Sequence, residues 1–202
     1  GKILNVYTYS NSISILGCVR TVIKDLNNNE INYYGEQVKI YIYEQFLSIN
    51  RMTKLRLVFN VEEEVLTNEK YFIQKDMLNH IAMVLSNIRN SENDVILVTA
   101  GAIASGIEQA RISKYPTELS DKQALAAIGQ VELIKRYQNI FDEYTQMIAQ
   151  VLLARDIIDN QKQQFNARNT FKKLLSLGII PVINENDTIS TADIQQENNY
   201  DL

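Results

Sequence analysis

The sequence has few of the features that mark secreted, membrane-spanning or nucleic-acid-binding proteins. One cysteine among 202 residues excludes an internal disulfide and fits a reducing compartment. No apolar run approaches the roughly 18 residues that a membrane-spanning helix needs, and no signal-peptide pattern opens the chain. A net charge of -4 without a basic block argues against nucleic acid as the main partner. We therefore expect a cytoplasmic protein with no membrane and no nucleic-acid partner.

The single cysteine and the single histidine do not form an evident Cys–His catalytic pair. Cys18 has no evident histidine partner, because His80 lies in an amphipathic helical pattern. We interpret Cys18 as a buried structural residue and His80 as a packed or half-exposed helix residue. A functional thiol at Cys18 is the alternative.

The composition changes near residue 52. Residues 1–51 are rich in tyrosine and asparagine, whereas Met52 and Thr53 precede a basic residue and an apolar run. That arrangement is typical of a start codon followed by a first strand. We predict that residues 1–51 form an N-terminal extension or fused segment, and that residues 52–202 form the main domain. An ordinary internal methionine at position 52 is the alternative.

Residues 1–51 contain the pattern of one possible βαβ unit. Two β-favouring apolar stretches occupy residues 2–7 and 38–43, and residues 14–26 have helical apolar spacing. Residues 27–35 would form the connecting loop. No function follows from this unit.

The main domain alternates between apolar runs and helical patterns. Strands are predicted at residues 55–61, 94–99, 147–153 and 179–184, and helices at residues 72–88, 102–110, 121–144 and 161–177. Alternating strands and helices imply parallel pairing through right-handed crossovers. We predict an α/β fold, a three-layer α/β/α sandwich around a mainly parallel sheet, with 46% hydrophobic residues to fill its core.

Polar and small residues follow two of the predicted strands, where parallel sheets bind ligands. Gly101 stands between a strand and a helix, where backbone N–H groups can approach an anion. Asp187 could pair with an α-ammonium group, and Asn184 could donate to a carboxyl oxygen. A plain polar turn is the alternative at residues 184–187.

Five segments occur in fixed order in the second half of the chain. They are VTAGAIASG (98–106), KQALAAIGQ (122–130), AQVLLAR (149–155), FNARNT (165–170) and PVINENDT (181–188). This series closely resembles the glutamate-binding half of the glutamate 5-kinases, which are members of the amino-acid kinase family. The resemblance implies ATP-dependent phosphorylation of the L-glutamate side-chain carboxylate, in proline biosynthesis, with ATP and Mg²⁺ as cofactors.

The family's substrate residues carry over only in part. Asn184 and Asp187 match, but the position of the family's serine is Ala100, so one hydroxyl donor is missing. The family's later Gly-Asp-Asn-Asp run corresponds to residues 197–200, in which only Asn199 is retained. The resemblance thus implies a substrate site at Ala100, Gly101, Asn184, Asp187 and Asn199.

The phosphate side departs further from the family. The family's first strand runs into Lys-x-Gly-Ser/Thr-Ser, and the aligned residues here run from Asn60 through Val61 to Glu62, Glu63 and Glu64. Phosphoryl transfer depends on positioning and charge stabilisation, so carboxylates at this place oppose it. Asn60 holds the cofactor-binding lysine position, and no residue is assigned as catalytic or metal-binding. We expect little or no kinase turnover from this chain.

The resemblance also bears on partners. Most of the family's nucleotide pocket comes from a half that would follow residue 202, so we expect a missing C-terminal half, a partner subunit or a homo-oligomer. Two other functions stay open. One is a non-catalytic amino-acid-binding or regulatory module, and the other is a structural subunit that retains the kinase fold.

Overall fold

The computed structural model describes residues 4–8, 21–24, 30–33, 54, 56–154, 157 and 160–188. These ranges contain a seven-stranded sheet with the strand order β3-β2-β1-β4-β5-β7-β6. The strands are β1 Leu4–Thr8, β2 Thr21–Lys24, β3 Glu30–Tyr33, β4 Arg56–Val61, β5 Asp94–Thr99, β6 Ile148–Leu153 and β7 Ile180–Glu185.

The part of the sheet that holds the sequence motifs is parallel. Strand β4 pairs with β5, β5 with β7, and β7 with β6, all in parallel. Helices make the connections, because parallel neighbours cannot be joined by a tight turn. They are α3 Lys75–Asn90 after β4, α4 Ala102–Ala110 and α5 Leu119–Glu143 after β5, and α6 Gln161–Ser176 after β6.

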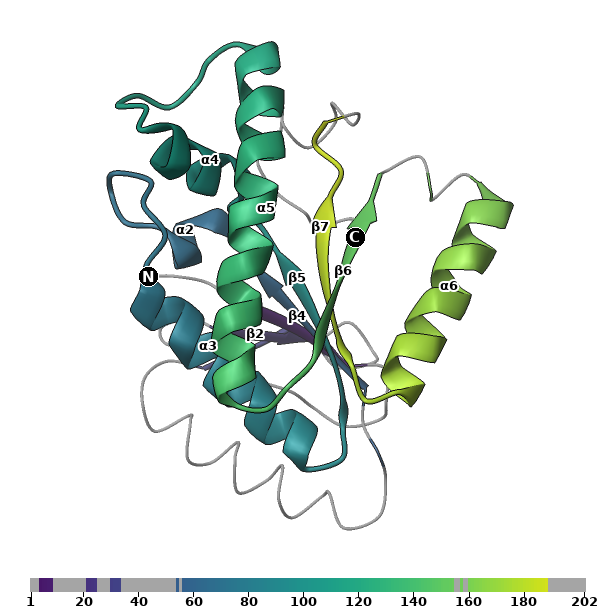
Figure 1. Cartoon of the computed structure of the whole chain (residues 1–202). Helices are drawn as coiled ribbons and strands as arrows, with labels where there is room; N and C mark the ends of the chain where they lie inside the picture. The colour runs from purple at the N-terminus through teal and green to yellow at the C-terminus, as the bar shows by residue number, and fades with distance from the viewer. Residues whose placement is uncertain are drawn as a thin grey trace.

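Helices lie on both faces of this sheet (Figure 1). The larger core cluster joins α3 and α5 to the face that carries Phe59 and Leu97. A smaller cluster packs Leu175 of α6 on the opposite face, where Val98 and Ile183 point. Side chains alternate between the two faces along each strand, so both faces of β4, β5 and β7 are covered. The predicted α/β sandwich with a mainly parallel sheet is confirmed.

Strand β1 joins this sheet from the other direction. It pairs in antiparallel fashion along β4, from Leu4 opposite Val61 to Thr8 opposite Leu57. Its second neighbour, β2, is parallel to it, and β3 is antiparallel to β2. Backbone pairing therefore links β3, β2 and β1 to β4 and so to the parallel part of the sheet.

Two predictions for the first 51 residues are wrong. The connecting loop expected at residues 27–35 contains strand β3 at Glu30–Tyr33. The helix expected at residues 14–26 is replaced at Thr21–Lys24 by strand β2, which pairs with Glu30–Tyr33. Three β-branched residues in a row, from Thr21 to Ile23, favour an extended chain over a helix. The strand expected at residues 2–7 is found at Leu4–Thr8, and residues 38–43 lie outside the described ranges.

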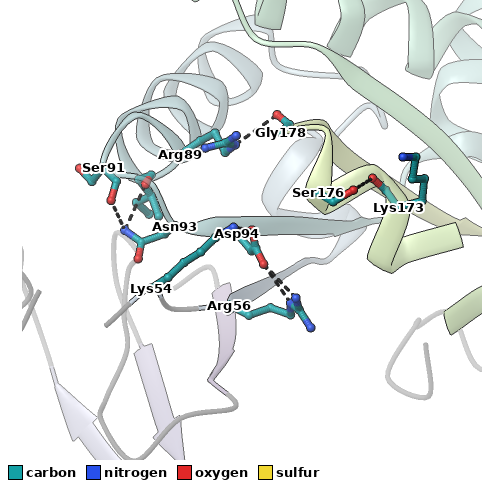
Figure 2. Close-up of polar contacts among 10 residues, drawn as sticks. Lys54, Arg56, Arg89, Ser91, Asn93, Asp94, Lys173, Ser176 and Gly178 are labelled. Atoms are coloured by element: carbon teal, nitrogen blue, oxygen red, sulfur yellow. Dashed lines mark hydrogen bonds and ion pairs between the residues drawn. The ribbon is translucent and has the colours of Figure 1, made fainter. Parts of the chain in front are cut away.

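The amino ends of β4 and β5 are tied together by charge. Asp94, whose side chain is 7% exposed, pairs with Lys54 and accepts from Arg56 Nη2 at 2.9 Å (Figure 2). Near the start of β7, Arg89 Nε donates to the Gly178 carbonyl at 3.1 Å. Both contacts fix the ends of the strands opposite to the sequence motifs. In the described part of the chain, no helix has the length and apolarity needed to cross a membrane.

Candidate functional site

The carboxyl ends of β4, β5, β7 and β6 lie along one edge of the sheet. Val61 stands opposite Thr99, and Leu153 stands opposite Glu185. Beyond the strands, the Ala100 amide donates to the Val61 carbonyl at 3.0 Å. The polar segments after β5 and β7 therefore meet at the edge where parallel α/β sheets bind ligands.

Gly101 makes the turn from β5 into α4. Its φ is +97°, in the left-handed region that favours glycine, and it is the N-terminal cap of the helix. A Cβ here would lie 3.3 Å from Ile73 Cδ1 and 3.4 Å from Leu66 Cδ1. Gly101 has no side chain to cap the first turn of α4, so the first amides of the helix depend on other acceptors. The junction thus joins a fixed turn to the positive end of a helix dipole.

Helix α5 lies against the start of α4 with almost no space between the two backbones. A Cβ added to Gly129 would overlap the Ala102 carbonyl oxygen, and one added to Gly106 would overlap the Leu125 carbonyl oxygen. The glycine-containing segments of the sequence therefore set the spacing of two helices. Gln130, the next residue of α5, is consequently held beside the first turn of α4.

Asn184 connects the end of β7 to α5. Its side chain is buried, its Nδ2 donates to Gln130 Oε1 at 2.8 Å, and its Oδ1 accepts from the Glu185 amide at 2.9 Å. Both ends of this amide are therefore engaged by the protein. Asn184 was predicted to meet substrate directly, and the structure adds a second role, that of orienting Gln130.

Asp187 lies in the turn that follows β7 and is half-buried. Two contacts shape this turn. The Asn186 amide donates to the Leu153 carbonyl at 2.6 Å, and Thr188 Oγ1 donates to Asn186 Oδ1 at 2.6 Å. The turn that contains Asp187 is thereby held near the ends of β7 and β6.

A second polar contact between α5 and the sheet was missed by sequence reasoning. Tyr137 is fully buried, and its hydroxyl lies 2.8 Å from Thr99 Oγ1 at the end of β5. Burial raises the pKa of the Tyr137 phenol, although the bond with Thr99 lowers it somewhat. Tyr137 follows Gln130 by seven residues, which is two helical turns, so both face the strand ends. This seven-residue spacing is the feature of the sequence from which a contact of Tyr137 with the strand ends could have been predicted.

Residues 60–64, which the sequence resemblance aligns with the family's phosphate segment, contain no basic side chain. Asn60 is buried at 4% exposure on β4 and shares a face of the sheet with Val98, opposite to the face that carries Asn184. Glu62 precedes the short helix α2, Glu63–Leu66, which was not predicted, and Glu63 and Glu64 form its first turn.

These residues do not fit a nucleotide phosphate. A neutral buried amide and neighbouring carboxylates supply no positive charge to a transferring phosphoryl group. In the ranges that are described, no three His, Cys, Asp or Glu side chains are grouped as metal ligands would be. Asn199 lies outside the described residues, so its predicted contact with substrate stays a prediction.

The comparisons with known proteins agree on one family. Residues 63–201 match the pattern of the amino acid kinase family. Over 145 residues the chain is 41% identical to the glutamate 5-kinases of Clostridium perfringens and Listeria monocytogenes, covering 72% of this chain and 54% and 52% of those proteins. For the Lactococcus lactis glutamate 5-kinase the identity is 39% over 151 residues, which is 56% of that protein. The chain thus spans about half the length of the curated relatives that it matches.

Proposed function

Because the chain belongs to the amino acid kinase family, we propose that it is a glutamate 5-kinase-like protein that binds L-glutamate at the carboxyl ends of β5 and β7. The observation that carries this proposal is the meeting of the β5–α4 junction with the Asn184–Asp187 turn at one edge of the sheet. The names of its relatives support glutamate as the amino acid.

Each part of an amino acid has a complement at this edge. Asp187 is the carboxylate for the α-ammonium group, and a charge-assisted bond of this kind is worth about 1.5–3 kcal/mol. The Gly101 turn and the first amides of α4 provide the positive end of a dipole for a carboxylate. Ala100 contributes no hydroxyl, and Asn199, which the resemblance assigns to the substrate site, lies outside the described residues.

The proposed activity of the lineage is phosphoryl transfer from ATP to the side-chain carboxylate of L-glutamate, with Mg²⁺, as a step of proline biosynthesis. By the resemblance, Asn60 and Glu62 occupy the places where the phosphate part of that reaction needs positive charge and an open backbone. A buried amide and a carboxylate supply neither. We therefore propose that this chain binds glutamate while turning over little or no ATP. Assembly with a further subunit or copy is proposed to complete the site.

Titration calorimetry with L-glutamate tests the binding proposal. Asp187→Ala should abolish the binding signal, because the α-ammonium group loses its carboxylate. Asp142→Ala is the matched control, since Asp142 is exposed at the end of α5. Unchanged affinity in the Asp187 variant would remove this residue from the site.

A coupled ADP-release assay tests the expected lack of turnover. The 202-residue chain with ATP, Mg²⁺ and L-glutamate should release ADP at the rate seen without glutamate. Glutamate-dependent ADP release would overturn the expectation and show that the carboxylates at residues 62–64 are compatible with phosphoryl transfer.

A second candidate function is a non-catalytic amino-acid-binding or regulatory module, which the neutral, buried Asn60 favours. Binding of glutamate or proline without any binding of ATP would support it over an enzyme. A structural subunit is the third candidate. For that candidate, no amino acid would bind, and the chain would form a stable hetero-oligomer on sizing chromatography.

A further inference from the structure

The hydrogen bonds around Asn184 fix the orientation of the Gln130 side chain. The Glu185 amide can only donate, so the oxygen of the Asn184 side chain must face it. The Asn184 nitrogen then faces Gln130 and can only donate, so Gln130 must present its Oε1 to Asn184. The Gln130 Nε2 group, with its two hydrogens, is therefore directed away from Asn184 as a donor. The orientation of the Gln130 side-chain amide is thus set, through Asn184, by the backbone N–H of Glu185.

The position of Gln130 follows from the residue before it. Gly129 lies against the carbonyl of Ala102, in the first turn of α4, so Gln130 is next to the Gly101 junction. Through Asn184 the same side chain contacts the end of β7. Gln130 thus stands between the two segments of the proposed glutamate site, and it is half-buried. No described residue accepts from its Nε2.

We infer that Gln130 is a substrate-binding residue whose Nε2 donates to a carboxylate of the bound amino acid. This inference rests on the proposed glutamate site and adds a residue to it. A donor is needed there because Ala100 supplies no hydroxyl, and the Nε2 of Gln130, whose Oε1 accepts from Asn184, is the donor that we assign to this role. Asn184 then acts through Gln130, in that it holds the amide with its nitrogen toward the ligand.

Two variants of Gln130 separate a ligand contact from a structural one. Gln130→Glu keeps an oxygen acceptor for the Asn184 Nδ2 but replaces the outward donor by a carboxylate oxygen. Gln130→Met has similar length and loses both the acceptor and the donor without adding charge. If Gln130 binds substrate, calorimetry should show the affinity for L-glutamate falling about 10- to 100-fold in both variants.

A structural role predicts a different pattern. Affinity would then fall in the Met variant alone, because the Glu variant still satisfies Asn184. Asn139→Asp, on the exposed side of the same helix, is the control for an amide-to-acid change, and it should bind glutamate as the parent chain does. If Gln130→Glu does not fold, thermal melting will show it, and Gln130→Met still rejects the inference if its affinity for L-glutamate is unchanged.

The outcomes also separate this inference from the function on which it rests. Parent chain that binds L-glutamate, together with a Gln130→Glu variant that binds equally well, rejects the role of Gln130 and leaves the glutamate site standing. Parent chain that does not bind L-glutamate rejects the proposed function and this inference with it. Loss of affinity in both variants, with Asn139→Asp unchanged, supports both.

Discussion

Among single residues, Gly129 has the clearest steric constraint, and the first prediction concerns it. Gly129→Ala should destabilise the protein by about 1–3 kcal/mol or more, because the new methyl group overlaps the Ala102 carbonyl and α5 must move away from α4. Urea denaturation measures the change in the free energy of unfolding. Ile128→Ala, at an exposed position of the same helix, should change that free energy far less.

The same displacement reaches the proposed site. A shift of α5 moves Gln130 relative to Asn184, so Gly129→Ala should also weaken glutamate binding under conditions where the variant is folded. A variant with full stability would show that the two helices can separate at no cost, contrary to the close approach of their backbones.

The buried phenol of Tyr137 gives a prediction in pH. Its pKa is raised in the folded protein by burial, so an unfolded chain loses this proton near pH 10 while the folded chain keeps it. The contribution of Tyr137 to stability is therefore complete below pH 10 and is lost as the pH rises above it. Between pH 9 and 11, the unfolding free energy of Tyr137→Phe should fall less steeply than that of the parent chain.

At neutral pH the same variant should lose about 1 kcal/mol, because Thr99 loses one hydrogen-bond partner and keeps its bond to the Ala100 carbonyl. Chemical denaturation at a series of pH values gives both results. Parallel pH curves for Tyr137→Phe and the parent chain would mean that the phenol ionises without unfolding.

Among the elements, the sequence was sufficient for those whose pattern is continuous. Strand β5 is a run of apolar residues and α4 begins at a glycine, so both were predicted with the observed bounds. Helix α2 was missed because four residues carry no period that can be recognised. Strand β2 was missed because its apolar spacing also fits a helix, and its pairing with β1 and β3 decides between them.

The segment between α2 and α3 is held by a charged contact that gives the third prediction. Arg136 on α5 donates two hydrogen bonds to Glu108 on α4, at 2.9 and 3.0 Å, and Glu108 Oε2 accepts from the Ile73 amide at 3.3 Å. The bond with Glu108 is the main cause of the raised pKa of Arg136. This chain of contacts places Ile73 against Gly101.

Arg136→Lys keeps the charge and loses the fork that binds both carboxylate oxygens. We expect a loss of about 1 kcal/mol, since both side chains are partly exposed. Hydrogen exchange at the Ile73 amide should become faster, because Glu108 is no longer held in place. Lys135→Met, at the exposed neighbouring position, should leave exchange at Ile73 unchanged, and equal exchange in the two variants would contradict this coupling.

For the molecule as a whole, part of the candidate site could be predicted from the sequence, and part became evident only in the structure. The positions of Gly101, Asn184 and Asp187 could be predicted, because strand ends in a parallel sheet converge at one edge. The contact of Asn184 with Gln130 could not, because it depends on the rotation of α5 about its axis. That rotation is set by Gly129 against α4, a contact between helices that no local pattern records.

The last prediction concerns residues 1–51, whose separation from the main domain stays a prediction. Strand β1 pairs with β4 over five residues, so a variant that begins at Met52 would expose the edge of β4 from Leu57 to Val61. Unpaired N–H and C=O groups on a strand edge promote aggregation. We therefore expect the variant to be less soluble than the parent chain and to unfold at lower urea concentration.

Sizing chromatography and urea denaturation of the two proteins measure these effects. Val6→Pro, at the residue opposite Phe59 in the ladder, is the milder form of the experiment, because it removes one backbone donor from β1 and leaves the chain length unchanged. The free energy of unfolding of this variant should lie between that of the parent chain and that of the shortened variant. If the chain beginning at Met52 stays monomeric and equally stable, β4 tolerates an open edge, and residues 52–202 are a domain that folds without the extension.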